Sequence, residues 1–515
     1  MLIYDLNGRG LISESAHFII IGGGTAGLVA AVRLAQRTGQ KVVCLESGGL
    51  RQDDDAHPFN EVIQTGALYR GADSGRFRCI GGTSTRWGGA MIPFQPADLD
   101  SSIYPIAMDD LMPYVAELEA LFDLDGGVYS DPAFPFSLGQ EHVNRMAKWP
   151  PFKKRNVAQL LNEPIRSEAN LQVWFNAHVT DIHSSVDGVI VHATSINGDK
   201  IDINARKLII AAGAIETTRL ALLIDRTHEN AVSSISPAVG RYFSDHISIE
   251  VGEIDPLDRS KLNEIIGFRF GPNGSMRNIR FELAPDASVR KTLPPSFTHI
   301  GFASETRGGF DVLREIYQYL QRRCLPPLGV GIELLSNMPW LLRAVWWRFK
   351  KKRLLFPQGA RLLVHVVIEQ EPIPENRISL SETRHDIFGT PLAEIHWNIS
   401  ELDKKNLLNT AKLFLKSWNE SDFSKLGKFN LFNEDEVCTS LADTGGIFHP
   451  TGSTRMSADP SFGAVDPDLN LFGVPNVQLL ATSVLPTGGG ANPTMMLLLL
   501  TLRCVDQHRK KLAHT

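Results

Sequence analysis

The 515-residue sequence contains few cysteines and no long hydrophobic run. Its five cysteines are scattered, and none forms a C-x-x-C pair or the ligand spacing of a metal site. We therefore expect reduced thiols, no bound metal and a cytoplasmic location. The longest apolar stretch near the C-terminus, residues 495–502, is interrupted by Thr501. It is far shorter than the roughly 20 residues that cross a membrane.

Other features are also missing. Before the first glycine cluster the chain has acids at Asp5 and Glu14 but no apolar core of roughly 7–15 residues, so we expect no signal peptide. The formal net charge of −5 gives no reason to expect nucleic acid as a partner. With 43% hydrophobic and 21% charged residues, the composition is typical of a globular protein. Internal repeats and low-complexity linkers are absent from the sequence.

A glycine-rich turn near the N-terminus predicts a dinucleotide site. The apolar residues 17–21 have strand length, Gly22-Gly23-Gly24-Thr25-Ala26-Gly27 follows, and residues 28–37 have helical apolar spacing. Gly22 permits the tight turn, Gly24 lets the backbone approach a pyrophosphate, and Gly27 lets the helix pack against the strand. The amides at the helix N-terminus would then face the anion. The alternative is a glycine-rich turn with a structural role only.

An acid follows the next predicted strand. Residues 41–45 end at Glu46, close to the spacing of about 20 residues at which a carboxylate binds ribose hydroxyls. Such an acid repels a 2′-phosphate, which disfavours NADP. No second G-x-G-x-x-G follows a strand, although enzymes that reduce flavin with NAD(P)H commonly carry one. We therefore expect the electrons to come from the substrate.

The remainder of the chain alternates between strand and helix patterns. Further strands are predicted at residues 188–193, 207–212, 362–368, 393–399 and 477–480. An amphipathic helix is predicted over residues 402–418, and a last helix from Pro493. Near the end, His449-Pro450-Thr451-Gly452-Ser453-Thr454-Arg455-Met456 and Gly490-Ala491-Asn492-Pro493-Thr494 bring a histidine and an asparagine to the same part of the chain.

These motifs together resemble the glucose-methanol-choline (GMC) family of FAD-dependent oxidoreductases, most closely its pyranose-oxidising branch. The resemblance covers nearly the whole chain. The matching segments, in the order of the family, are residues 22–27, 81–89, 176–179, 212–216, 243–246, 449–456 and 490–494. It implies an α/β protein with a Rossmann-like FAD-binding domain, discontinuous in sequence, and an inserted α+β substrate domain on a mixed or antiparallel sheet. We place the FAD-binding domain at residues 14–100, 165–250 and 440–512, and the substrate-binding domain with its cap segments at 101–164 and 251–439.

The resemblance also implies the residues that contact FAD. Val179 would meet the adenine through its backbone, and His449 with Asn492 would face the flavin ring. The complete set of predicted cofactor residues is Gly22, Gly24, Thr25, Ala26, Gly27, Glu46, Ser47, Gly82, Thr83, Ser84, Arg86, Trp87, Val179, Ala212, Gly213, Ala481, Thr482, Asn492, Pro493 and Thr494.

Two positions depart from relatives. Arg86 stands where the pyranose-oxidising branch has a histidine bonded covalently to flavin, so we expect noncovalent FAD. Ala481-Thr482-Ser483 stands where many relatives have an Asp in the loop.

The predicted reaction is oxidation of an alcohol, such as a sugar, glycoside or polyol hydroxyl, to a carbonyl. A neutral imidazole is suited to accept the hydroxyl proton near neutral pH, so His449 is the predicted general base while hydride passes to flavin N5. Asn492 would donate to the developing alkoxide. A helix beginning at Pro493 would direct its dipole toward the reduced flavin. Oxygen, a quinone and a protein are all possible electron acceptors.

Alternatives remain open for the function and for several residues. A lyase or photodecarboxylase on the same scaffold would not need His449 as a base, and a catalytically idle flavoprotein would need no substrate. Asn492 could merely cap the last helix. Glu369 and His365 could contact substrate or be ordinary strand residues. By default we treat five histidines other than His449 as ordinary core or surface residues: His57, His142, His178, His246 and His365.

The segment 340–356 is not explained by alcohol oxidation. It contains six basic residues, tryptophans and no acid. This composition suits a helix with a solvated basic face, a membrane surface or lipid-linked substrate, an oligomer contact, or an acidic substrate.

Overall fold

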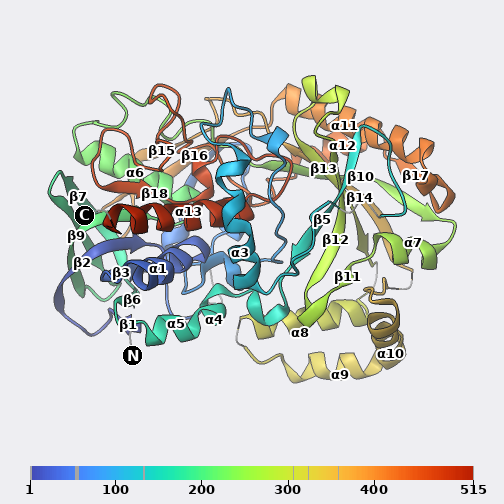
Figure 1. Ribbon diagram of the computed structural model, residues 1–515, viewed down its shortest axis with the longest axis horizontal. Coiled ribbons are helices and arrows are strands. Elements are labelled where there is room, and N and C mark those ends of the chain that lie inside the picture. The colour runs from blue at the N-terminus through green and yellow to red at the C-terminus, as the bar shows by residue number, and fades with distance from the viewer. Residues whose placement is uncertain are drawn as a thin grey trace.

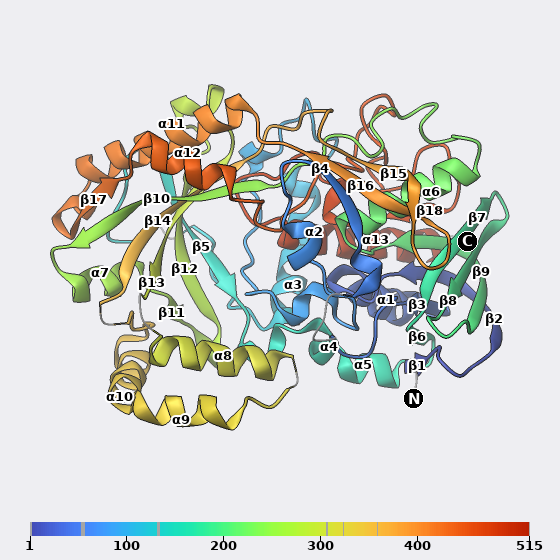
Figure 2. The same ribbon diagram turned by 180° about the vertical axis from the view of Figure 1, so that it is seen from behind.

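A computed structural model describes residues 3–52, 57–130, 134–304, 307–322, 324–357 and 359–513. Two large sheets lie side by side, and a group of helices extends below the second one (Figures 1 and 2).

The first sheet is mainly parallel. Its strand order is β1 (Ile3–Asp5), β6 (Leu171–Phe175), β3 (Val42–Leu45), β2 (Leu11–Ile21), β9 (Lys200–Ile210), β8 (Gly188–Thr194) and β7 (His178–Ser185), with β18 (Val477–Leu479) also on β9. Only the β9–β8 and β8–β7 pairs are antiparallel. The central strands carry runs of fully buried aliphatic residues, as expected of a parallel sheet covered on both faces.

Three longer helices accompany this sheet: α1 (Thr25–Thr38), α6 (Ala214–Thr227) and α13 (Thr494–Ala513). Helices α1 and α13 contact each other, although they come from opposite ends of the chain. Gly27 allows α1 to lie close to β2, because a Cβ there would be only 1.9 Å from the Gly22 carbonyl oxygen.

The second sheet is antiparallel throughout. Its order is β11 (Arg269–Phe270), β12 (Met276–Leu283), β13 (Ser296–Ala303), β14 (Arg361–Glu369), β10 (His246–Pro256) and β17 (Gly427–Leu431), with β5 (His142–Trp149) also on β12. Helix α11 (Glu401–Glu420) packs against β14 and β17, and α12 (Glu434–Ala442) against β10. Helix α7 (Arg259–Ile266) lies nearby.

A small third sheet contains β15 (Arg377–His385), β16 (Pro391–Trp397) and β4 (Val62–Gly66), and it contacts α6 (Figure 2). The group of helices below the second sheet consists of α8 (Gly309–Gln321), α9 (Leu328–Ser336), α10 (Met338–Trp346) and a π-helical turn at Trp347–Lys351. We call residues 309–351 the helical lobe. Short helices are α2 (Gly71–Ser74), α3 (Val115–Phe122), α4 (Val157–Leu160) and α5 (Asn162–Ser167).

The predicted fold class is confirmed, with two differences in detail. Strand β2 begins at Leu11 rather than at residue 17, because its first half pairs with residues 200–205 of β9. The last helix begins at Thr494, so Pro493 immediately precedes its first residue. The domain limits stay a prediction. Among the described residues no helix is both long and apolar enough to cross a membrane.

Candidate functional site

A cavity of about 590 Å³ is lined by residues at the ends of strands of the first sheet. It extends to the second sheet, which contributes Trp149 and Arg280 to its lining. Strands β2, β3 and β9 run parallel, so the loops that follow them open at the same edge of the sheet. Every predicted site residue lines this cavity except Gly27 and Pro493. Gly27 lies behind the wall, where it allows α1 to approach β2.

Two glycine loops meet at one end of the cavity. A Cβ on Gly82 would lie 2.8 Å from the Gly24 Cα, so this contact requires glycine at position 82. At Gly24 a Cβ would meet nothing nearer than 4.0 Å. Helix α1 has no side-chain cap at its N-terminus, which lies at this end. Its first amides are therefore available to an anion.

Glu46 is a buried acid beside the glycine loop. One carboxylate oxygen accepts the Gly23 amide at 2.8 Å and the other accepts the Gly48 amide at 2.9 Å. Burial raises the pKa of this carboxyl, against the opposing effect of these amides and of Arg78. Glu46 thus shapes the glycine turn and also faces the cavity, where its remaining lone pairs can accept ribose hydroxyls.

Arg78 supports the same end of the cavity and was not predicted from the sequence. Its guanidinium donates to the Ser47 hydroxyl at 2.8 Å and to the Glu216 carboxylate at 2.8 Å. The sequence offers no recognisable signal for this residue, because its partners lie on three separated segments. Together, the open helix end, the glycine contact and the buried acid fit the phosphates and ribose of a dinucleotide.

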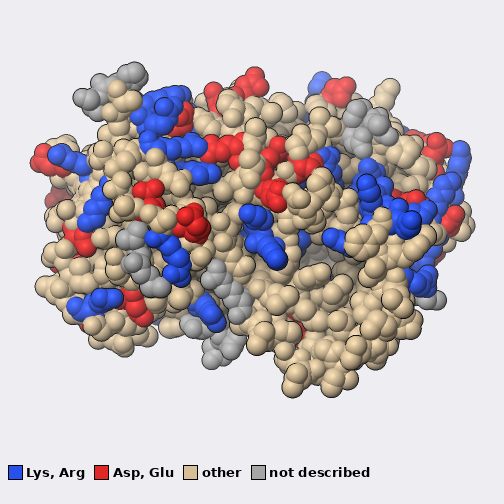
Figure 3. Space-filling model, turned by 60° about the horizontal axis from the view of Figure 1, so that its bottom comes forward, with Lys and Arg blue, Asp and Glu red and all other residues tan. Residues whose placement is uncertain are grey.

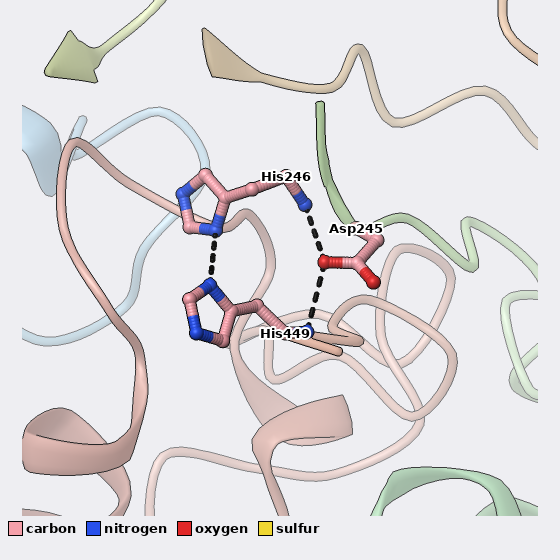
Figure 4. Close-up of side chains that lie close together, drawn as sticks. All are labelled: Asp245, His246 and His449. Carbon is pink, nitrogen blue, oxygen red and sulfur yellow. Dashed lines mark hydrogen bonds between the residues drawn. The ribbon is translucent and has the colours of Figure 1, made fainter. Parts of the chain in front are cut away.

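The predicted base lies at the other end of the cavity, next to a second histidine (Figure 4). The Nδ1 atoms of His449 and His246 are 3.2 Å apart, and His246 Nε2 lies 2.8 Å from the Gly489 carbonyl oxygen. Sequence reasoning treated His246 as an ordinary histidine. Its position one residue after Asp245, in a segment that matches the family, was the available signal.

Asp245 fixes the backbone around both histidines. Its carboxylate accepts the amides of His246 and His449 at 2.6 and 2.8 Å, as well as the Phe448 amide and the Tyr69 hydroxyl. Figure 4 shows the two histidine contacts. Asp245, His246 and His449 have potential metal-ligand atoms within 4.8 Å of one another. The oxygens of the Asp245 carboxylate nevertheless already accept hydrogen bonds from four donors. We therefore assign Asp245 to positioning His449 rather than to binding a metal.

Asn492 and Arg280 complete the arrangement. The Asn492 amide nitrogen is 2.8 Å from His449 Nε2, and the Arg280 guanidinium donates to the Asn492 carbonyl oxygen. Arg280 is buried on β12, its Nε has no hydrogen-bond partner among the described residues, and its guanidinium lies 4.3 Å from the Phe297 ring centroid. Arg280 was not predicted, because residues 276–283 also contain Arg277 and Glu282 and nothing in the sequence distinguishes Arg280 from these charges.

The partners determine which histidine nitrogens carry protons. The Gly489 carbonyl can only accept, so His246 Nε2 is protonated and its Nδ1 is an acceptor. His449 then donates from Nδ1 and accepts from Asn492 at Nε2. These residues form one chain of hydrogen bonds in which each donates to the next, in the order Arg280, Asn492, His449, His246 and the Gly489 carbonyl. His449 has an unprotonated Nε2 at the cavity.

The electrostatics favour this neutral state. Burial, followed by the charges of His246 and Arg280, moves the pKa of His449 well below its usual value. Burial lowers the pKa of His246 to about 4 and that of Arg280 to about 10. Burial also raises the pKa of Asp245 to about 6.

Three other residues considered from the sequence, Ser84, Arg86 and Glu369, have hydrogen-bond partners within the protein. The Ser84 hydroxyl donates to the Gly81 carbonyl and accepts the Val157 amide, so it also holds the loop together. Arg86 donates to Gln52 at 2.5 Å and lies over the Phe77 ring. Glu369 accepts the Gly489 amide behind the histidines, and burial raises its pKa to about 7.

Comparisons with known proteins identify families and relatives that this chain resembles. The description "GMC oxidoreductase" belongs to the family whose profile matches residues 372–501, and "Pyridine nucleotide-disulphide oxidoreductase" to the one that matches residues 16–233. The 2-methyl-1,2-propanediol dehydrogenase of Mycolicibacterium austroafricanum is 22% identical over 96% of this chain and 95% of its own. Paromamine 6'-oxidase of Streptomyces fradiae is 23% identical over 94% and 90%.

Solved structures show the same fold. Pyridoxine 4-oxidase from Mesorbium loti superposes with a TM-score of 0.60 at 14% identity, over 96% of this chain and 99% of its own. A variant of the Aspergillus oryzae RIB40 formate oxidase gives a TM-score of 0.60 at 17% identity, over 97% and 99%.

Proposed function

Because the chain belongs to the GMC oxidoreductase family and is an FAD-dependent oxidoreductase, we propose that it oxidises an alcohol hydroxyl to a carbonyl. The relatives support this substrate class, since their names describe enzymes acting on 2-methyl-1,2-propanediol, paromamine and fructose. Within the class we propose a hydroxyl on a sugar, glycoside or polyol.

The observation that carries the proposal is the unprotonated His449 Nε2 beside Asn492. Bound FAD would supply the acceptor for the hydride, which carries both electrons of the oxidation. The residues of the chain provide the remaining chemistry. His449 accepts the hydroxyl proton at Nε2, which becomes accessible when the alcohol replaces Asn492 as its partner. Proton transfer to a positioned base typically contributes about 10²–10⁴ in rate.

Asn492 and Arg280 then act on the substrate oxygen. An amide N–H of Asn492 can donate to the oxygen as negative charge develops on it. The Arg280 guanidinium fixes the orientation of that amide by donating to its carbonyl oxygen. Its positive charge in a buried setting also favours a developing alkoxide.

We also propose that FAD is held without a covalent bond. The residue at the attaching position is Arg86, whose side chain is engaged with Gln52 and Phe77. Its guanidinium has no reactive nitrogen comparable to a neutral imidazole.

An anaerobic substrate screen tests the proposed function. Purified holoenzyme is mixed with panels of primary alcohols, polyols, sugars and glycosides, and bleaching of the flavin absorbance is followed. We expect at least one panel member to reduce the flavin in the wild type and only slowly in His449→Ala. If no alcohol bleaches the flavin, an idle flavoprotein is favoured. Turnover of a substrate that survives in His449→Ala would instead favour lyase chemistry.

A further inference from the structure

The helical lobe presents large apolar side chains to the outside. On α9 and α10 they recur at helical spacing, so that each helix has an apolar stripe facing solvent. This face, which we call the apolar face, consists of Leu325, Leu328, Ile332, Leu335, Leu342, Val345, Trp346 and Phe349. Leu328 is 90% exposed and Phe349 is 72% exposed. Figure 3 shows the lobe as a broad surface with few charged side chains.

This exposure is not the usual arrangement of a surface helix. An amphipathic helix normally turns its apolar stripe toward the core. Here the lobe has its own buried contacts at Val312, Val330 and Trp347, while the larger apolar set points away. A contiguous exposed apolar surface of this kind marks an interaction site.

The charges around the apolar face indicate its partner. The basic residues Arg343, Arg348, Lys350, Lys351 and Lys352 are exposed and lie on or directly after α10. Arg343, Lys350 and Lys352 form no ion pair among the described residues. The single acid on α9 and α10, Glu333, is paired with Arg307 at 2.7 Å. Apolar side chains that include a tryptophan, bordered by cations without an ion pair, complement a partner that has an apolar interior beneath an anionic surface.

We propose that the helical lobe docks on an anionic lipid bilayer. The apolar face enters the boundary between headgroups and acyl chains, while the cations contact the headgroups. The helices lie in the interface, since none of those described is able to span the bilayer.

The lobe is also connected to the cofactor cavity. At the end of α8, the buried Gln321 side chain donates to the carbonyl oxygens of Ser84 and Trp87 at 3.1 and 3.0 Å. Both of these residues line the cavity. Docking of the lobe would therefore hold one wall of the cavity near the lipid.

Vesicle co-sedimentation of the full-length holoenzyme tests the proposal. Phosphatidylcholine vesicles with and without phosphatidylglycerol are used at low and high salt. We expect binding to the anionic vesicles that weakens at high salt, because the electrostatic attraction is screened within about 10 Å at 0.1 M. The triple variant Leu328→Ser, Leu335→Ser, Leu342→Ser should bind at least about tenfold more weakly. The triple variant Arg343→Gln, Lys350→Gln, Lys352→Gln should show a similar loss.

Matched controls separate the lobe from the general surface. Val186→Ser, Ile196→Ser and Leu257→Ser remove exposed apolar residues elsewhere. Lys405→Gln, Lys416→Gln and Lys428→Gln remove exposed cations that form no ion pair among the described residues. Both controls should bind as the wild type does.

Several results would overturn the proposal. One is a wild type that fails to sediment with anionic vesicles at low salt. Another is equal binding by the lobe variants and the controls. A third is a self-associated wild type that the serine variant converts to monomers without any lipid binding, since the apolar face would then serve a second copy.

Discussion

His449 depends on neighbouring residues for its position and its tautomer. His246 accepts a hydrogen bond from the Nδ1–H of His449, the Asn492 amide donates to its Nε2, and the Asp245 carboxylate accepts its backbone N–H. The position and tautomer of the base therefore depend on two other segments of the chain, residues 245–246 and the loop that carries Asn492.

The first prediction concerns the reacting pair. His449→Ala should retain flavin but slow its anaerobic reduction by about 10² or more, as expected for the loss of a general base. Asn492→Asp should also be slow, because a carboxylate opposes the charge of a developing alkoxide. Stopped-flow absorbance measures both rates. If both variants stayed within about threefold of the wild type, a barrier change of only about 0.6 kcal/mol, the pair would be structural.

The second prediction concerns His246. His246→Leu removes the acceptor for the His449 Nδ1 proton, so we expect reduction to slow by about tenfold or more, since a wrong tautomer impairs base catalysis. His246→Asn keeps an acceptor oxygen near the same position and should recover most of the rate. Nitrogen NMR of labelled histidine should show the Nδ1-protonated tautomer of His449 in the wild type and Asn variant, but a mixture in the Leu variant.

The pH dependence provides a second readout for His246. Because the pKa of His449 is lowered, its base form persists as the pH falls below 6.5. The acidic limb of the wild-type reduction rate should therefore lie below pH 6.5. His246→Leu removes one of the groups that lower this pKa, so its limb should move upward. Equal rates, tautomers and pH profiles in all three proteins would contradict a positioning role.

At the scale of elements, the cofactor end of the cavity is built from helix α1, strand β3 and the loop of residues 81–89. Glycine at position 82 permits the loop to touch Gly24, and Glu46 ties the end of β3 to the turn before α1. The same carboxylate thus has two functions: it holds the turn and offers acceptors to a ribose.

The third prediction tests these two functions. Glu46→Arg should lower FAD occupancy sharply, because a cation replaces the acceptor of two amides and of the ribose. Glu46→Gln keeps one carbonyl oxygen and should retain an intermediate occupancy. The ratio of flavin to protein absorbance after gel filtration measures it, with circular dichroism as the control for folding. Unchanged occupancy in Glu46→Arg would exclude Glu46 from the site.

At the scale of the whole molecule, the cavity exists because two sheets from different parts of the chain meet. The first sheet supplies the nucleotide end, and Arg280 reaches the catalytic end from β12 of the second sheet. The start of α6, including Glu216, lines the cavity, and the third sheet packs against α6. FAD bound in this cavity would contact many segments without a covalent attachment.

The fourth prediction concerns that attachment. Purified protein should be yellow, and acid or heat denaturation should release its FAD into the supernatant, because Arg86 replaces the attaching histidine. Absorbance and fluorescence of supernatant and pellet after centrifugation measure the release. Flavin that stays with the washed, precipitated chain would contradict noncovalent binding.

The sequence by itself determined the α/β fold class, the FAD cofactor and the family, because glycines, strand lengths and the order of motifs are local features. Most predicted strands and helices were found within a few residues. The beginning of β2 was missed because its first half pairs with β9, a contact between residues about 190 apart. The site residues themselves stay predictions, although the structure brings His449 and Asn492 together.

Only the tertiary structure revealed Arg280, Arg78 and the role of His246, because their partners lie far away in the sequence. A hydrogen bond such as that from Arg280 to Asn492 joins residues 212 apart, and no local pattern encodes it. The same holds for the helical lobe. The composition of residues 340–356 was compatible with several kinds of surface, but the direction of the apolar stripes on α9 and α10 is set by their packing against α8. These hydrogen-bond partners and the exposure of the apolar stripe depend on burial and on contacts between distant residues, which exist only in the folded chain.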